Sequence, residues 1–171
     1  QGLGAVLIVT VFVQIFWFFG IHGPNVLAPV LEGIWGQAQL INIDIFQKGY
    51  EGKTGTAAVL AAIDDGKAYM WVRGSFDAFA WFGGSGGTIV LIIAILLFSK
   101  RADYLTVGKL SLGPGIFNIN EPIMFGLPVV LNPIMFIPFV IAPLVATTIG
   151  WVATYLWLVA PVSQQVAWVT P

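Results

Sequence analysis

Long stretches without charged side chains dominate this chain. Residues 1–21 and 122–171 contain no Lys, Arg, Asp, Glu or His, and Ser75–Phe98 contains only Asp77. About 20 consecutive apolar residues suffice to cross a bilayer as a helix. We therefore expect one span at Leu3–Gly20 and a second at Ser75–Phe98. The last stretch has room for two spans, or for one span and a re-entrant hairpin.

Two polar segments separate these stretches. Asn42–Arg73 carries charges of both signs, and its apolar run Thr56–Ile63 predicts a short surface helix that stops at Asp64. Ser99–Lys109 contains three cations and one acid. Basic loops of membrane proteins stay in the cytoplasm. We therefore place Ser99–Lys109 in the cytoplasm and, by alternation, Asn42–Arg73 on the other side.

The composition is that of an all-α integral membrane protein. The 171 residues are 58% hydrophobic and 9% charged with a net charge of −1, against about 25% charged residues in soluble domains, and the mean hydropathy is +0.91. These values exclude a soluble globular domain, a disordered chain and a nucleic-acid-binding protein. With no Cys and one His, thiolate and two-His metal sites are excluded, and no cofactor is expected. The 20 Gly and 10 Pro predict interrupted helices.

The C-terminal stretch is interrupted at the segment Gly113–Pro128. Proline lacks a backbone N–H and disfavours helix before it, so we expect no continuous helix through the prolines. These recur at Pro122, Pro128, Pro133, Pro138 and Pro143. Broken backbone at membrane depth survives only where it is buried in protein or lines a wet cavity. Glu121 lies at the break, so it is a candidate functional carboxylate; the alternative is a proline-rich hairpin whose Glu caps a helix.

A second interruption follows the first apolar stretch. Trp17–Asn25 (WFFGIHGPN) ends in a turn broken by Gly and Pro that carries His22, the only histidine. Histidine titrates near neutrality and both donates and accepts hydrogen bonds. The alternative is an interfacial His beside a Trp of the aromatic belt. Two interrupted segments together indicate a transporter binding site.

Other features allow more than one interpretation. Gly83–Thr88 is not a phosphate loop of the Gly-Lys-Ser/Thr type, and we interpret it as close helix packing or a kink. Asp77 lies either at the interface or in a pair with Arg73 one turn earlier. Trp17 and Trp168 flank the broken segments; stacking on a sugar ring and membership of the aromatic belt are equally open for both.

Several motifs resemble a known family. It is the membrane-embedded enzyme IIC of the bacterial phosphoenolpyruvate-dependent sugar phosphotransferase system, in the lactose/cellobiose/diacetylchitobiose branch. The matching motifs, in the order of that family, are Trp17–Gly23, Phe82–Gly86, Lys100–Tyr104, Ile119–Pro128, Asn132–Pro133 and Phe136–Phe139. The polar stretch Val30–Lys67 matches least well. Members of the family are about twice this length or more, so the chain is expected to lack an N-terminal half.

The resemblance implies a function and a site. A β-linked disaccharide of the cellobiose, diacetylchitobiose or lactose type crosses the bacterial cytoplasmic membrane and is phosphorylated on its 6-hydroxyl by a phosphocysteine of the partner protein or domain IIB. The site is built on two re-entrant hairpins. His22 and Glu121 match its conserved polar residues and are the catalytic candidates. Asn120, Trp17 and Trp168 match further sugar contacts.

The resemblance also implies the architecture around this site. Residues 1–171 form part of one multi-pass domain in the lipid bilayer, and the missing half supplies a homodimer interface. From the residues alone, Glu121 or His22 can accept the proton of an attacking hydroxyl. A rival function is an ion- or proton-coupled secondary transporter with Glu121 as the coupling residue. A third is a passive membrane subunit that anchors a partner.

Overall fold

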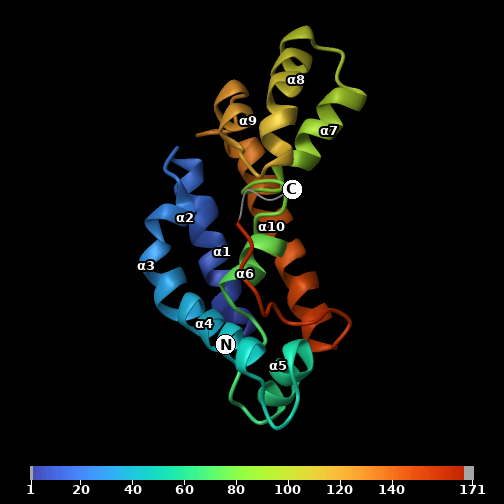
Figure 1. Cartoon of the computed structure of the whole chain (residues 1–171). Coiled ribbons are helices and arrows are strands. Elements are labelled where there is room, and N and C mark those ends of the chain that lie inside the picture. Colours follow the sequence, from blue (N-terminus) through green and yellow to red (C-terminus); the bar gives the residue numbers. More distant parts are fainter. Residues whose placement is uncertain (1, 168–171) are drawn as a thin grey trace.

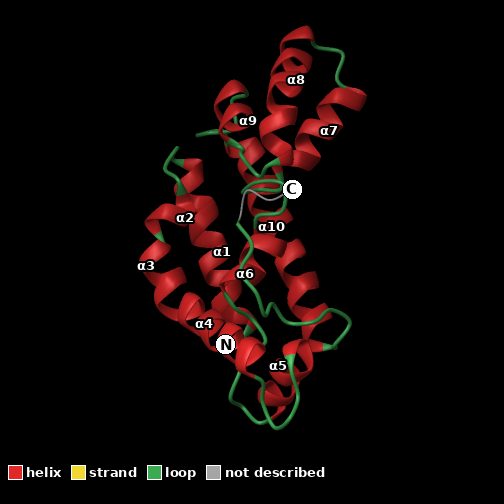
Figure 2. Ribbon diagram, in the orientation of Figure 1, coloured by secondary structure: helices red, strands yellow, loops and turns green. Residues whose placement is uncertain are grey.

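The computed structural model describes residues 2–167, and this part is helical without a β-strand (Figure 2). The helices in chain order are α1 (Leu3–Phe18), α2 (Gly23–Val26), α3 (Ala28–Val30), α4 (Gln37–Lys48), α5 (Gly55–Asp64), α6 (Arg73–Ser75), α7 (Thr88–Phe98), α8 (Ala102–Ile116), α9 (Glu121–Gly126) and α10 (Pro133–Tyr155). Two π-helical segments, η1 (Leu31–Gly36) and η2 (Phe76–Ala80), complete the helical elements. The expected all-α class is confirmed for the described residues.

The molecule is elongated, as Figure 1 shows. The α7–α8 hairpin forms one end, and α4 and α5 form the other. The long helices α1 and α10 pack against each other between these ends. Among the described residues, only α10, with 23 residues, is long and apolar enough to cross a membrane by itself. The helix α1 is apolar but has 16 residues.

The expected span at Ser75–Phe98 is not one helix. The structure divides it into the end of α6, then η2, a loop at residues 81–87 and α7. We call residues 81–87 the glycine loop, because four glycines in it have positive φ values between 65° and 90°. A regular helix cannot pass through such residues. The sequence interpretation of this motif as close packing is confirmed, because a Cβ at Gly86 would lie 2.0 Å from the ring of Phe139. The alternative of a kink within a continuous helix is wrong, because the helix is fully interrupted.

The proline-rich stretch is interrupted where Pro122, Pro128 and Pro133 fall. Pro122 and Pro133 lie in the first turns of α9 and α10, where the missing N–H costs little, and Pro128 lies in the turn between them. The other two prolines, Pro138 and Pro143, lie inside α10. As expected, no helix runs through all five. The six-residue α9 and the span-length α10 fit one span with a short broken segment.

The polar segment at the far end folds as a helical hairpin. The predicted helix at Thr56–Ile63 is confirmed as α5 (Gly55–Asp64), which ends before Gly66 with φ of +69°. One face of α5 is buried against α4. Asn42 of α4 also binds two distant segments: its side-chain Nδ2 donates to the carbonyls of Tyr69 (2.8 Å) and Val162 (3.1 Å). Because Val162 follows α10, this hydrogen bond holds the segment after α10 against α4.

Aromatic residues form the centre of the main core. Phe76 is fully buried, and its ring lies 5.1 Å from that of Trp35, 5.7 Å from that of Trp71 and 5.4 Å from that of Trp81. Aromatic rings at these separations attract one another beyond the effect of area burial. The cluster gives η2 a rigid support, and η2 leads directly into Trp81 and the glycine loop.

Candidate functional site

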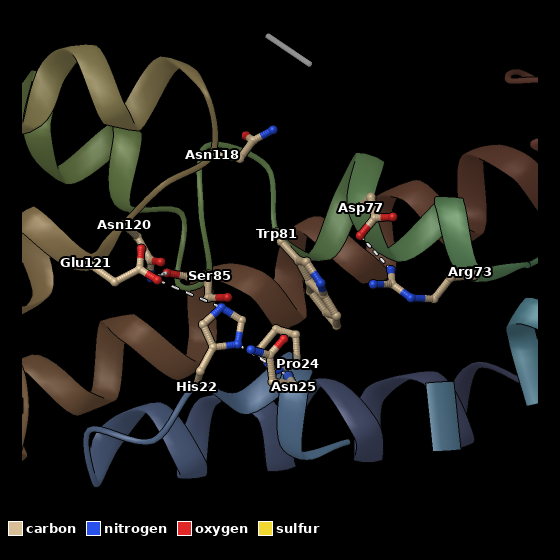
Figure 3. A pocket seen from close by; sticks show the side chains of 10 residues that line it. All are labelled: His22, Pro24, Asn25, Arg73, Asp77, Trp81, Ser85, Asn118, Asn120 and Glu121. Carbon is tan, nitrogen blue, oxygen red and sulfur yellow. Dashed lines mark hydrogen bonds and ion pairs between the residues drawn. The ribbon is translucent and has the colours of Figure 1, made fainter. Parts of the chain in front are cut away.

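One cavity of about 330 Å³ lies beside the interrupted segments, and we call it the polar pocket (Figure 3). This volume is within the range of small-molecule sites. The pocket is formed by α2 and the turn before it, by α6 and η2, by the glycine loop, and by the start of α9 with the turn before it. Its lining residues are His22, Pro24, Asn25, Arg73, Asp77, Trp81, Ser85, Asn118, Asn120 and Glu121.

The position of His22 is set by a very close contact between α2 and α1. At Gly23 a Cβ atom would lie 2.2 Å from the carbonyl oxygen of Val13, so only glycine allows this approach. His22 caps α2, and its Nδ1 accepts a hydrogen bond from the backbone N–H of Asn25 at 3.3 Å. The ring of Trp17 supports the imidazole from behind, with centroids 4.8 Å apart. With Nδ1 as acceptor, the neutral ring carries its proton on Nε2.

Glu121 approaches the same imidazole from another segment. It is the first residue of α9, and Pro122 follows it. Its Oε1 lies 3.9 Å from Nε2 of His22, and the two side chains are 44% and 37% exposed. The pair is thus not closed off, and both groups can contact a molecule in the pocket. Figure 3 shows the carboxylate and the imidazole facing each other.

Two asparagines connect the α8–α9 turn to the glycine loop. Asn118 has a φ of +62°, and its Oδ1 accepts from the backbone N–H of Gly83 at 2.9 Å. Asn120 is buried, and its Nδ2 donates to the carbonyl of Ser85 at 3.2 Å. At Gly84 a Cβ would lie 2.7 Å from that of Asn120. The turn that carries Glu121 and the glycine loop therefore form one packed unit.

The far end of the pocket carries an ion-pair network. Arg73 Nη1 donates to Asp77 at 2.5 Å, and its Nε donates to Glu32 at 2.9 Å. The Asp77–Arg73 pair, one of two alternatives from the sequence, is thus confirmed. Trp81 lies between this network and Glu121 (Figure 3), and its buried Nε1 has no hydrogen-bond partner in the described part of the chain.

The structure unites some of the predicted site residues and separates others. His22, Asn120 and Glu121 line one pocket. Trp17 is 1% exposed and packs behind His22, and the lining described here does not include it. Trp168 lies outside the described residues. The sugar and catalytic roles of all five stay predictions.

Sequence reasoning missed part of the lining. Trp81 directly precedes the motif Phe82–Gly86, and Asn118 lies two residues before Asn120, so both stood next to motifs already recognised. Ser85 was missed because the segment Gly83–Thr88 was interpreted through its glycines as a packing or kink site. Arg73 was missed because it was counted as the end of the polar segment Asn42–Arg73. Among residues 2–167, no three His, Asp or Glu side chains gather in a way that could hold a metal ion.

Comparison with known proteins supports the motif resemblance. A family model described as "Phosphotransferase system, EIIC" matches residues 1–143. The chain belongs to this EIIC family. EIIC proteins are integral membrane proteins, which agrees with the composition.

Individual relatives cover the whole chain. It is 59% identical over 177 residues to the cellobiose-specific EIIC component of Lactococcus lactis subsp. lactis (strain IL1403), and 37% identical over 172 residues to the oligo-beta-mannoside-specific EIIC component of Bacillus subtilis (strain 168). Each alignment covers 100% of this chain and 36% of the relative. The crystal structure of ChbC, the IIC component of an N,N'-diacetylchitobiose-specific phosphotransferase system, matches with a TM-score of 0.81 and 34% identity over 99% of this chain and 36% of ChbC. The chain therefore spans about a third of these relatives.

Proposed function

We propose that this chain forms the sugar site of a phosphotransferase-system permease. It binds a β-linked disaccharide, carries it across the membrane, and presents its 6-hydroxyl to the phosphocysteine of IIB. The observation that carries the proposal is the meeting of His22 and Glu121, from two interrupted segments, across one pocket. Membership of the EIIC family and the sugar-specific names of the relatives support it.

The proposed chemistry needs a positioned hydroxyl and an acceptor for its proton. The sugar O6 attacks the phosphorus of phosphocysteine, the S–P bond breaks, and the thiolate leaves with the bonding electrons. Phosphoryl transfer depends chiefly on positioning and electrostatics. The Glu121 carboxylate accepts the O6 proton, while His22 donates from Nε2 to a neighbouring hydroxyl. This division follows from the Nδ1 acceptor role of His22, which leaves Nε2 as the donor on the pocket side.

The shape of the pocket supports a disaccharide. Hydrogen-bonding groups lie at both ends: His22 and Glu121 at one, and the Arg73–Asp77 pair at the other. Trp81 lies between them. An indole offers an apolar face to the CH groups of a sugar ring. We propose that the ring to be phosphorylated lies at the Glu121 end and the second ring near Arg73.

The proposed topology places the pocket between the two membrane surfaces. We propose that the broken segments at α2 and α9 belong to re-entrant hairpins, within one multi-pass domain of the bacterial cytoplasmic membrane. The α7–α8 end and the α5 end lie at opposite extremes of the molecule (Figure 1), which supports opposite sides of the membrane for Ser99–Lys109 and for the α5 part of Asn42–Arg73. Arg73 itself lines the pocket. Parts of the protein beyond this chain would form the homodimer interface.

The basic segment Ser99–Lys109, which comprises the turn between α7 and α8 and the first half of α8, is the proposed docking side for IIB. Arg101 donates hydrogen bonds to Asp103 at 2.6 and 3.1 Å, and these bonds lower the pKa of that carboxyl. Arg101 is thus neutralised by its neighbour. Lys100 and Lys109 have no ion-pair partner among the described residues, so they can meet an acidic partner surface.

The test is phosphorylation by phospho-IIB in membrane vesicles that contain the full-length protein. A panel of cellobiose, diacetylchitobiose, lactose and a monosaccharide is supplied, and the product is analysed for the 6-phosphate. We expect at least one β-disaccharide to arrive as its 6-phosphate. Accumulation of unmodified sugar that depends on an ion gradient would contradict the proposal and favour a secondary transporter.

A further inference from the structure

The glycine loop places a hydroxyl in the wall of the polar pocket that the proposed sugar contacts do not use. Ser85 is 5% exposed and lines the pocket. Its Oγ makes no hydrogen bond to any residue in the described part of the chain. Figure 3 shows Ser85 beside His22 and Asn120. This Oγ is not one of the fully enclosed side-chain atoms that lack a partner, so it is accessible from the pocket and can donate a hydrogen bond to a ligand there.

The backbone around Ser85 adds hydrogen-bond donors. The φ angles are positive at Gly84 (+90°) and Gly86 (+85°), and Ser85 between them is not among the residues with positive φ. Alternating signs of φ in successive residues form concavities of backbone N–H groups that bind anions. Within residues 2–167, the N–H groups of Ser85 and Gly86 have no hydrogen-bond partner. Donors of this kind suit anionic oxygens.

The helix α7 begins directly after this loop. It has 11 residues from Thr88, and its N-cap, Gly87, has no side chain that could cap it. Within residues 2–167 the N–H groups of Ile89 and Val90 donate to the carbonyls of Gly83 and Gly87, both at 3.0 Å, and the N–H of Thr88 is left without a partner. The positive end of the helix dipole therefore lies beside the glycine loop, which favours negative charge there. The unpartnered Ser85 hydroxyl indicates a polar ligand at this wall of the pocket, and the dipole of α7, which begins three residues after Ser85, favours a negatively charged one.

We propose that Ser85 Oγ and the glycine-loop N–H groups bind the phosphoryl oxygens of the sugar 6-phosphate as it forms. This inference rests on the proposed function. As O6–P forms and S–P breaks, the thiolate leaves and the O6 proton moves to Glu121. The charge of the transferred phosphoryl group then lies against the donors of the loop.

The charges around the pocket are compatible with this assignment. The described lining contains two carboxylates, Asp77 and Glu121. Asp77 is paired with Arg73. Glu121 becomes neutral when it accepts the O6 proton, so its repulsion of the new phosphate is removed in the same step. Asn118 and Asn120 act as positioning residues, because their side chains hold the loop at Gly83 and Ser85.

Ser85→Ala in the full-length protein tests the inference, with Ser111→Ala as control. Ser111 is also a buried serine whose Oγ lacks a partner in the described part of the chain, but it lies in α8 outside the described lining. We expect Ser85→Ala to bind the unmodified disaccharide like the wild type. Binding of its 6-phosphate and transfer from phospho-IIB should fall about 10- to 100-fold, the size of a lost hydrogen bond to a charged oxygen. Ser85→Thr, which keeps the hydroxyl, should recover part of both.

The outcomes separate this inference from the proposed function. Equal loss of affinity for sugar and 6-phosphate in Ser85→Ala would make Ser85 an ordinary sugar contact and overturn the inference. Wild-type 6-phosphate affinity in Ser85→Ala would overturn it as well. If the wild-type protein phosphorylates no disaccharide, the proposed function fails. The comparison of 6-phosphate and unmodified sugar then still decides whether the loop binds an anion.

Discussion

Replacement of Glu121 by Gln distinguishes three possible roles of this residue: in folding, in sugar binding and in phosphoryl transfer. Gln keeps the size and one acceptor oxygen of the side chain but removes its charge and basicity. The His22–Glu121 distance is 3.9 Å, and both side chains are more than a third exposed. Ion pairs of this kind contribute at most about 1 kcal/mol. We therefore expect Glu121→Gln to fold and to reach the membrane at the wild-type level.

Sugar binding and phosphoryl transfer should respond differently to this change. A hydrogen bond to a charged acceptor is worth about 1.5–3 kcal/mol. Because the amide oxygen of Gln can still accept, the loss of sugar affinity should lie at the lower end, about tenfold. The loss of a general base slows proton transfer by about 10²–10⁴-fold. The transfer rate at saturating sugar should therefore fall much further than the affinity.

The assay measures the rate of 6-phosphate formation from phospho-IIB at saturating disaccharide, with sugar affinity measured separately. Glu51→Gln is the matched control, because Glu51 lies in the turn between α4 and α5, outside the described lining of the pocket. Its kinetics should equal those of the wild type. A wild-type rate in Glu121→Gln would refute the base assignment and leave Glu121 as a binding residue at most.

Three further changes test the rest of the site, and a fourth tests the topology. His22→Gln should retain more sugar affinity than His22→Asn, because Gln places its amide donor near Nε2 whereas Asn imitates Nδ1; equal loss in equilibrium binding would contradict the donor role. Trp81→Ala should weaken disaccharide binding by about 1–3 kcal/mol in calorimetry, and Trp81→Phe should recover part of this, whereas unchanged affinity would remove the stacking role. Trp17→Ala should act through loss of support for the His22 ring, so its effect should shrink in a His22→Ala background; full additivity would disprove the coupling. A cysteine at Ser99 should react only with reagents added from the cytoplasmic side, and labelling from outside would reverse the topology.

The sequence alone determined the features that depend on local composition and on single residues. Membrane character follows from long uncharged stretches. The breaks at Gly20–Pro24 and around Pro122 follow from residues whose backbone cannot continue a helix. His22 and Glu121 stood out because each is an ionisable residue at such a break. These inferences need no knowledge of which segments meet.

Only the tertiary structure decided which residues share the pocket. Asn118 and Gly83, and Asn120 and Ser85, lie 35 positions apart and are joined by hydrogen bonds that no hydropathy pattern contains. Hydropathy averages over Ser75–Phe98 predicted one span, although the glycine loop divides it, because positive φ angles leave no trace in an average of side-chain polarity.

The tertiary structure also decided which tryptophan lines the pocket. Trp17 and Trp81 are both tryptophans next to a broken segment. The family resemblance implied a sugar contact for Trp17 and named none for Trp81. The structure packs Trp17 behind His22 and places Trp81 in the lining of the pocket. An indole suits a core, a membrane interface and a sugar site equally well. Its role is therefore set by the segments that pack around it, through contacts between residues far apart in the chain.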